Sequence, residues 1–477
     1  MLERLLPNSA MVAMLLVLAG LSAAVAEIEV VDPFEVVAAL DRAVEMKLWP
    51  GFDAGAYPAA IYDGSRTLLF RHPAPPSEFE PLDGRPGVSV FAGKHPAMRW
   101  NSNAEIGGLA TATLLLTLEP GRPVEYEAHI LFHEIFHLYS RPLHPTWRPD
   151  EMSRYSYPVG DVDNYRQLLL EEEALARAVE AEADETSAAW ATTALRIRND
   201  RMSRLRAEHR AYEIALELQE GTAVYVGRST LRAADDTSRL REPRGPGGIR
   251  WRCYETGAAI AVILDRLMPS WKSTLDAEPE ATFAELLGTP VARTRVSPAA
   301  FTDDEVAGIA ARSGSEVAEL SEQRAALQEA FDQRGPQIIV RLADERDRLR
   351  LEQFDPMAVE LLVNGRALHT HRLLARHPRG EVRLENPHFV RGSFDGVIAM
   401  SEPAGEHPFL AGLRRIVVAG SSGEPVVAWD GDRVRIEAEG LAVEFDHATL
   451  ETNDHALIVT VLPDTTGSTS GPRVLSR

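Results

Sequence analysis

Residues 124–139 read VEYEAHILFHEIFHLY. Apolar residues recur in it at three- and four-residue spacing, which is typical of a helix with one buried face. Residues 133–137 (HEIFH) form an HExxH motif. Residues four apart share a helix face, so both imidazoles can reach one metal ion. Because buried histidines and glutamates are costly without partners, the pattern predicts a metal site.

The two histidines need a third protein ligand if they hold a zinc ion with an open coordination position. No histidine follows the motif at the HExxHxxGxxH spacing, so the alternative is a glutamate on a second helix. Two acidic groups further along the chain are candidates. They are Glu171–Glu173 within LLEEEALARA, and Glu217 with Glu220 within ELQEGTAVYVG.

Glu220 is the preferred third ligand. The small residues Gly221 and Ala223 follow it, and small residues let two helices, or a helix and a metal ion, approach closely. A glycine inside a helix costs about 1 kcal/mol, so it indicates a packing reason. We expect Glu171–Glu173 to form a solvated helix face. Glu217, one turn before Glu220, is either a residue that supports the site or a solvated one.

The order of these motifs resembles the gluzincin clan of zinc metallopeptidases, which includes thermolysin-like and aminopeptidase-like enzymes. In many of these families the glutamate of E-G-x-A-x-Y is the third ligand, which implies zinc ligation by His133, His137 and Glu220. The resemblance also implies that Glu134 is the general base. A later YETG sequence resembles the Y-E-x-G of alanyl-aminopeptidase-like enzymes and implies that Tyr254 stabilises the oxyanion.

The resemblance covers about residues 125–260 and departs from the clan in two places. The segment between HExxH and the expected third ligand is far longer than one helical hairpin, which indicates a helical insertion at about 145–210. Residues 105–111 (EIGGLAT) stand where aminopeptidases carry G-x-M-E-N, and they lack the Met-Glu-Asn triplet. Aminopeptidase specificity therefore does not carry over, and the substrate-binding residues stay unassigned.

The expected fold class is α+β: a mostly helical gluzincin-like catalytic domain, a small mixed N-terminal β region and a C-terminal all-β domain. Beyond Gly335-Pro336 the chain has short β-rich runs separated by turn signals such as Asn364-Gly365. The expected segments are a signal peptide at 1–26, a mixed α/β region at 27–122, a helical zinc-peptidase domain at 123–334, a β domain at 335–463 and a disordered tail at 464–477.

Composition limits the partners of the chain. Its 477 residues suffice for more than one domain core, and 71 acidic against 50 basic residues give a net charge of −21. Such a chain has no general attraction to nucleic acid or anionic membranes. We expect a peptide or protein substrate, no nucleic acid and no stable membrane insertion beyond the signal segment. The sequence does not predict the oligomeric state.

Residues 11–26 (MVAMLLVLAGLSAAVA) form an apolar run that ends in the small-x-small sequence Ala24-Val25-Ala26. The pattern predicts a secretory signal peptide cleaved after Ala26, and hence a secreted or periplasmic protein. The run of 16 residues is short of the roughly 20 needed to span a membrane. An uncleaved N-terminal membrane anchor is the alternative.

Other polar residues have simpler interpretations. We expect Arg250 and Arg252 to be solvated loop residues and Cys253, the single cysteine, to be a packed thiol that excludes an intrachain disulfide. The histidines of the β domain fit no metal motif and are expected at the surface: His369, His371, His377 and His388.

Together these patterns predict a zinc-dependent metallohydrolase with one zinc ion per chain, and favour a peptidase that uses zinc-activated water. One alternative is a catalytically silent binding or scaffold protein of the envelope, in which the β domain acts. Another is a zinc hydrolase of a non-peptide substrate. The intact set of five site residues favours an enzyme, because pseudoenzymes usually lose a member.

The signal-peptide prediction can be tested by intact-mass spectrometry of protein recovered from the medium or periplasm. We expect a mature chain that begins at Glu27, because cleavage follows the small residues at Ala24 and Ala26. A mass that includes Met1 would contradict cleavage and favour the anchor.

Overall fold

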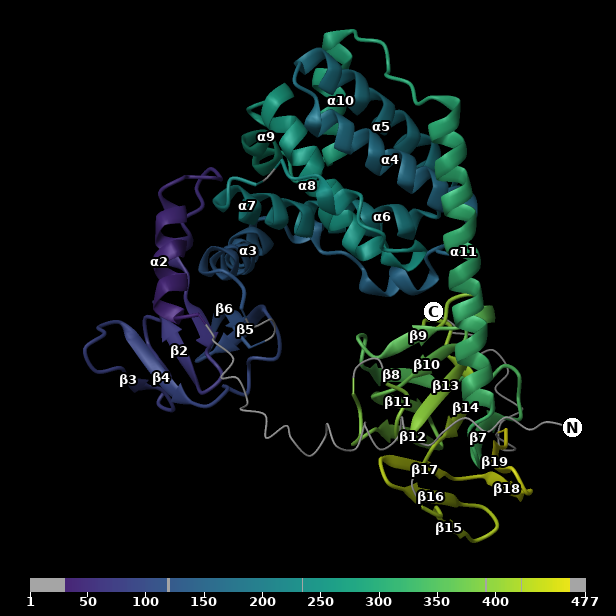
Figure 1. The fold of residues 1–477 in the computed structure, drawn as a ribbon. Helices are drawn as coiled ribbons and strands as arrows, with labels where there is room; N and C mark the ends of the chain where they lie inside the picture. The colour runs from purple at the N-terminus through teal and green to yellow at the C-terminus, as the bar shows by residue number, and fades with distance from the viewer. Residues whose placement is uncertain (1–30, 118–120, 234, 391–392, 422, 464–477) are drawn as a thin grey trace, which may run out of the picture. The chain divides into compact units, whose positions relative to one another are not determined.

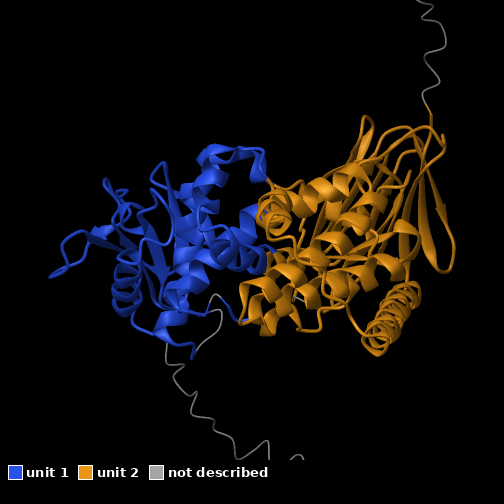
Figure 2. Cartoon of the chain, turned by 90° about the horizontal axis from the view of Figure 1, so that it is seen from above, with its two compact units in different colours: residues 1–148, 218–236, 257–281 blue, residues 149–217, 237–256, 282–477 orange. Residues whose placement is uncertain are grey.

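The computed structural model describes residues 31–117, 121–233, 235–390, 393–421 and 423–463 (Figure 1). The expected signal peptide and C-terminal tail lie outside the described residues. The α+β class is confirmed, and the chain divides into two compact units (Figure 2). The first unit contains the described residues up to Arg148 with Leu218–Asp236 and Gly257–Ala281; the second contains Pro149–Glu217, Thr237–Thr256 and the residues from Thr282 onward.

A mixed sheet forms one layer of the first unit, with strand order β3-β4-β2-β1-β6-β5. β1 pairs parallel with β6 and antiparallel with β2, whereas β5 pairs only with β6 among the described strands and forms an edge. The Asp63-Gly64 turn joins β1 to β2, and Gly64 has a positive φ of 101°. The strands are β1 (Ala59–Tyr62), β2 (Arg66–Phe70), β3 (Glu80–Pro81), β4 (Val88–Ala92), β5 (Ser102–Ile106) and β6 (Leu109–Leu115).

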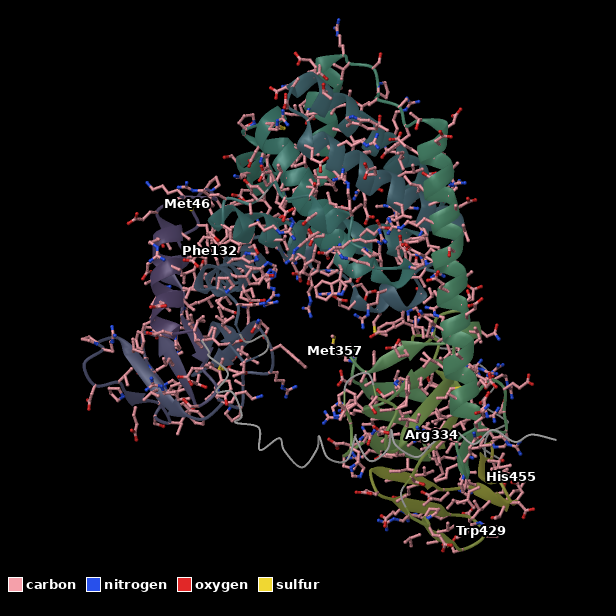
Figure 3. All side chains as sticks on the ribbon, in the orientation of Figure 1. Met46, Phe132, Arg334, Met357, Trp429 and His455 are labelled. Carbon is pink, nitrogen blue, oxygen red and sulfur yellow. The ribbon has the colours of Figure 1, made fainter. Side chains whose placement is uncertain are left out.

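Helix α3 packs against β5 and β6, and helices α2 and α7 pack against α3 (Figure 1). The apolar stripe of α3 is buried at Leu131, Phe132, Ile135 and Phe136, and Figure 3 marks Phe132. Each such side chain contributes about 1.5–3 kcal/mol to stability when fully buried. The stripe therefore fixes which face of α3 the motif histidines occupy. The helices of this unit include α2 (Pro33–Val44), α3 (Val124–Leu143), α7 (Thr222–Thr230) and α9 (Trp271–Ala277).

The second unit contains a helical part that includes most of the expected insertion. α4 and α5, joined through residues 181–183, pack along each other, and α11 packs on α4. The Asp161 side chain caps α4, and Thr302 with Glu305 forms a capping box at the start of α11. The helices are α4 (Val162–Glu180), α5 (Asp184–Arg204), α6 (Ala207–Leu216), α10 (Phe283–Thr294) and α11 (Asp303–Asp332); α8 (Ile249–Leu267) belongs to the second unit up to Thr256.

Two sheets form a β-sandwich in the C-terminal part of the second unit. Their strand orders are β18-β19-β7-β14-β13-β10-β9 and β15-β16-β17-β12-β11-β8. Apolar residues from both sheets share one core, including Val340 and Ile416 on one side and Val382 and Val443 on the other. Trp429 lies in the edge strand β15 (Figure 3).

The first strand of the sandwich begins four residues after Gln333, the C-cap of α11. The bounds of all the sandwich strands follow. They are β7 (Gln337–Leu342), β8 (Arg350–Phe354), β9 (Val359–Leu361), β10 (Ala367–His369), β11 (Arg372–His377), β12 (Gly380–Glu385), β13 (Ile398–Pro403), β14 (Leu413–Ala419), β15 (Val426–Trp429), β16 (Val434–Ala438), β17 (Leu441–Phe445), β18 (Ala448–Thr452) and β19 (Ala456–Val461). Asn364 and Gly365, between β9 and β10, both have positive φ, as the turn signal predicted.

His369 differs from the surface position expected for it. It is completely buried in β10, and its Nε2 lies 2.9 Å from Ser401 Oγ. All three residues of β10 are buried, and the rings of Phe354 and Phe409 contact the imidazole of His369. Burial lowers the pKa of His369 to about 3.

None of the described helices combines the length and apolar character of a membrane span.

We expect acid to destabilise the fold through His369. The unfolded imidazole takes up a proton near pH 6.5, whereas the folded one does so only at about pH 3. Between these values the unfolded state binds more protons, so the free energy of unfolding falls by about 1.4 kcal/mol for each pH unit that the pH drops. Urea unfolding of wild type and His369→Gln at pH 7 and pH 5 measures this. An equal loss in both proteins would contradict the prediction.

Candidate metal centre

Helix α3 places both motif histidines on one face. His133 and His137 are four residues apart, and their rings lie edge to face with centroids 4.7 Å apart. His137 is 2% exposed, and the His133 side chain is 13% exposed. One imidazole is therefore enclosed, and the other lies at the edge of the buried region.

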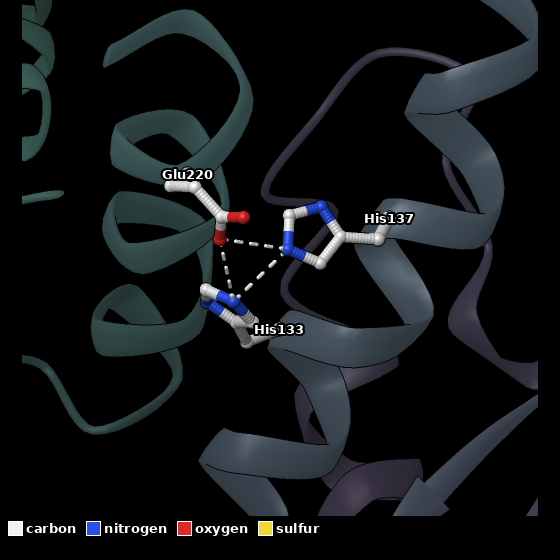
Figure 4. Close-up of side chains that lie close together, drawn as sticks. All are labelled: His133, His137 and Glu220. Atoms are coloured by element: carbon white, nitrogen blue, oxygen red, sulfur yellow. Dashed lines mark hydrogen bonds and ion pairs between the residues drawn. The ribbon is translucent and has the colours of Figure 1, made fainter. Parts of the chain in front are cut away.

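Glu220 lies in a short π-helical turn, η4 (Glu217–Gly221), between α6 and α7. A π turn holds one residue more than an α-helical turn and occurs frequently at functional sites. The Glu220 side chain is buried, and it points toward the two imidazoles in Figure 4. The small residues that follow it and the resemblance to E-G-x-A-x-Y predicted this residue as the third ligand, and the structure brings it to the histidines.

The three side chains converge on one point (Figure 4). His137 Nε2 lies 3.1 Å from His133 Nε2 and 3.1 Å from Glu220 Oε2, and His133 Nε2 lies 3.5 Å from Glu220 Oε2. Tetrahedral zinc with nitrogen and oxygen ligands at about 2.0–2.2 Å separates its ligand atoms by about 3.3–3.5 Å. The donor set and its spacing therefore fit a small divalent metal ion. Among the described residues, these three form the group that could hold one.

The charge state of Glu220 suits a metal ligand. Burial acts to raise its pKa, but the charge of His137 and hydrogen bonds from both histidines outweigh burial and hold the pKa well below its usual range. Glu220 is therefore a carboxylate at neutral pH. A metal ligand has to be in this deprotonated form.

Glu134 follows the first histidine and has a different electrostatic environment. Burial raises its pKa to about 7, with a lowering effect of His133 and a further raising effect of Glu220. A divalent cation beside it would favour the carboxylate form. Its backbone carbonyl accepts a hydrogen bond of 2.8 Å from Asn103 Nδ2, and Asn103 Oδ1 accepts one of 2.7 Å from Arg141. Asn103 thus ties edge strand β5 to α3 beside the site.

Glycines allow close helix packing at this site. A Cβ atom at Gly221 would lie 2.6 Å from the Cα atom of Gly257 in α8, so these two backbones touch. A Cβ atom at Gly227 in α7 would lie 2.6 Å from His129 Nδ1 in α3. The packing role predicted for Gly221 is confirmed, and its neighbour is the last residue of the YETG sequence.

The expected solvated face at Glu171–Glu173 is wrong for two of its three members. Glu171 and Glu172 are buried, and their carboxylates pair with arginines. Arg252 is the partner of Glu172 and is also buried, so its expected place in a solvated loop is wrong as well. Buried charges need partners, and these partners come from helices distant in sequence. Glu217 is likewise buried.

Tyr254 lies in α8, and its hydroxyl oxygen accepts a hydrogen bond of 3.0 Å from Arg250 Nη2. Its ring contacts Trp251, which is exposed. Tyr254 belongs to the second unit, whereas the three residues that could hold a metal belong to the first. Its role as an oxyanion donor stays a prediction.

Sequence reasoning missed Asn103, Arg141 and the arginine partners of the buried glutamates. No local pattern marks these residues, because each acts through a partner remote in sequence. Asn103 lies in a strand without a recognisable motif, and the arginines of α5 stand in an ordinary helical pattern.

Comparisons with known proteins add no assignment. No family model, no curated protein and no solved structure matches the chain.

We expect about one zinc ion per purified wild-type chain. Glu220→Ala should lower zinc affinity about 100-fold or more, since it removes a metal ligand and not merely a residue that orients one. Elemental analysis and competition with a chelator of known affinity measure both quantities. Glu208→Ala, at an exposed glutamate of α6, is the matched control and should keep wild-type affinity. Equal zinc content and affinity in Glu220→Ala and wild type would refute the assignment.

Proposed function

We propose that this protein is a zinc-dependent hydrolase, and that its substrate is a peptide or protein. The observation that carries the proposal is the convergence of His133, His137 and Glu220 with Glu134 next to the first histidine. Two imidazoles and one carboxylate form a donor set of the kind found in catalytic zinc sites, which leave a coordination position open. The resemblance of the motif order to zinc metallopeptidases supports a peptide bond as the target.

The residues of the site have distinct roles in this proposal. His133, His137 and Glu220 would hold the metal, which when bound lowers the pKa of water and polarises a carbonyl group. Glu134 accepts a proton from the attacking water and later returns it to the leaving amine. Tyr254 is proposed to donate a hydrogen bond to the oxygen that gains negative charge in the transition state.

The position of Glu134 supports its role as a base rather than a ligand. It is not a member of the three-residue group that could hold a metal, although it neighbours His133 in sequence. Burial raises the pKa of its carboxyl to about 7, and a bound divalent cation would favour the carboxylate form, which is the form that accepts a proton. A group of this kind can accept and release a proton in one reaction cycle.

The test is Glu134→Gln. We expect hydrolysis of a quenched fluorescent peptide library to fall about 10²–10⁴-fold, because the proton acceptor is lost. Zinc content should stay at the wild-type level, since the three ligands are unchanged. The measurements are initial cleavage rates and elemental analysis on the same samples.

Glu125→Gln is the matched control, because Glu125 is an exposed glutamate in the first turn of the same helix. It should cleave at the wild-type rate. Full activity in Glu134→Gln would rule out the assigned base. A zinc-loaded wild type that cleaves no peptide but hydrolyses an ester or amide of another class would favour the non-peptide alternative.

A further inference from the structure

A buried network of charged residues adjoins the turn that carries Glu220. Arg198 of α5 donates to both carboxylate oxygens of Glu217, with a distance of 3.0 Å for the Nη1–Oε1 pair. Thr256 Oγ1 of α8 donates to the same Glu217 Oε1 at 2.6 Å. Glu217 is the first residue of the π turn, and Glu220 is the fourth. The carboxylate at the start of the turn is therefore held by a guanidinium fork and a hydroxyl.

The network continues away from the turn. Arg198 Nη1 also donates to Glu171 Oε1 at 2.6 Å, and Arg201 donates to Glu171 Oε2 at 2.9 Å and to Glu213 at 2.8 Å. All of these side chains are buried. Arg198 and Arg201 lie nearly one turn apart on α5 and share Glu171, but Glu217 accepts hydrogen bonds from Arg198 and not from Arg201.

Stability alone is a weak explanation for such a network. Replacing buried ion pairs with apolar residues of similar volume is often neutral or stabilising, because desolvation offsets the attraction. A bidentate guanidinium–carboxylate pair does, however, fix the orientation of the carboxylate and of the backbone behind it. Of the charged residues that the insertion helices α4 and α5 supply, Arg198 is the one that contacts Glu217 at the start of the π turn.

The π turn makes this orientation matter for Glu220. In an α-helix, residues three apart lie on nearly the same face. The extra residue of a π turn lowers the rotation per residue, so Glu217 and Glu220 turn further apart. Glu217 can then meet Arg198 and Thr256 while Glu220 meets the two histidines. An α-helical turn would bring both carboxylates toward one side.

We propose that Arg198, Glu217 and Thr256 are positioning residues that hold the π turn so that Glu220 reaches the metal. This inference rests on the proposed function, because it concerns residues that hold the turn of the third ligand and do not themselves bind the metal. It also assigns a role to the helical insertion: α5 supplies the guanidinium that orients the ligand-bearing turn.

The experiment compares zinc affinity and thermal stability in Arg198→Met and Arg201→Met. Each variant replaces an arginine of α5 with an uncharged side chain of similar shape. Both lose a buried ion pair, so both should unfold at a lower temperature. We expect zinc affinity to fall about 10–100-fold in Arg198→Met, as is typical for residues that orient a ligand. In Arg201→Met the loss of zinc affinity should be clearly smaller, because Arg201 donates to Glu171 and Glu213 and not to Glu217. Chelator competition on the full chain measures the affinities.

Glu217→Gln and Thr256→Val are milder variants that decide the matter if Arg198→Met does not fold. We expect each to weaken zinc binding while far-ultraviolet circular dichroism stays unchanged. Each should also shift the visible absorption of Co²⁺ bound at saturation, because a displaced ligand changes the coordination geometry. Loss of global stability alone would leave that spectrum unchanged.

Equal losses of affinity in Arg198→Met and Arg201→Met would overturn the positioning role. The positioning role would also be overturned if the wild-type chain binds zinc and both Glu217→Gln and Thr256→Val keep wild-type zinc affinity and an unchanged cobalt spectrum. A wild-type chain that binds neither metal would instead overturn the proposed function, and this inference with it.

Discussion

The burial of the Glu220 carboxylate is the constraint on which the rest of the site depends. A carboxylate removed from water has to be compensated by opposite charge and hydrogen bonds. Here His133 and His137 supply both, and they hold the pKa of Glu220 far below its usual range despite its burial. A cation between the three groups would satisfy the same requirement more completely. This need for compensation explains why an apolar helix carries two histidines on one face.

Close backbone packing then acts at the last residue of the π turn, and a buried ion pair acts at its first residue. Gly221 ends the π turn and touches Gly257, whereas Glu217 begins it and is held by Arg198. A side chain larger than hydrogen at Gly221 would separate the two backbones. The EGxA and YExG sequences are thus linked by packing as well as by the chemistry that their resemblance implies.

The sequence predicted the regular parts of this protein well. The helix over 124–139 was recognised from its apolar spacing, and the structure extends it to Leu143. Strand runs and the Asn364-Gly365 turn predicted the β-rich C-terminal part, because these signals are local. The errors concern charged and titratable residues. Glu171, Glu172, Arg252 and His369 were all expected in water and are all buried.

Those errors have one physical cause. Exposure of a polar side chain depends on whether a partner is present, and the two arginine partners of Glu171 are 27 and 30 residues away in α5. Sequence by itself determined the element types, the pair of histidines on one helix face and the glutamate that completes the group, because periodicity and motif spacing are properties of the chain. Only the tertiary structure decided which of the other carboxylates are buried against arginines, because that choice depends on how helices remote in sequence pack.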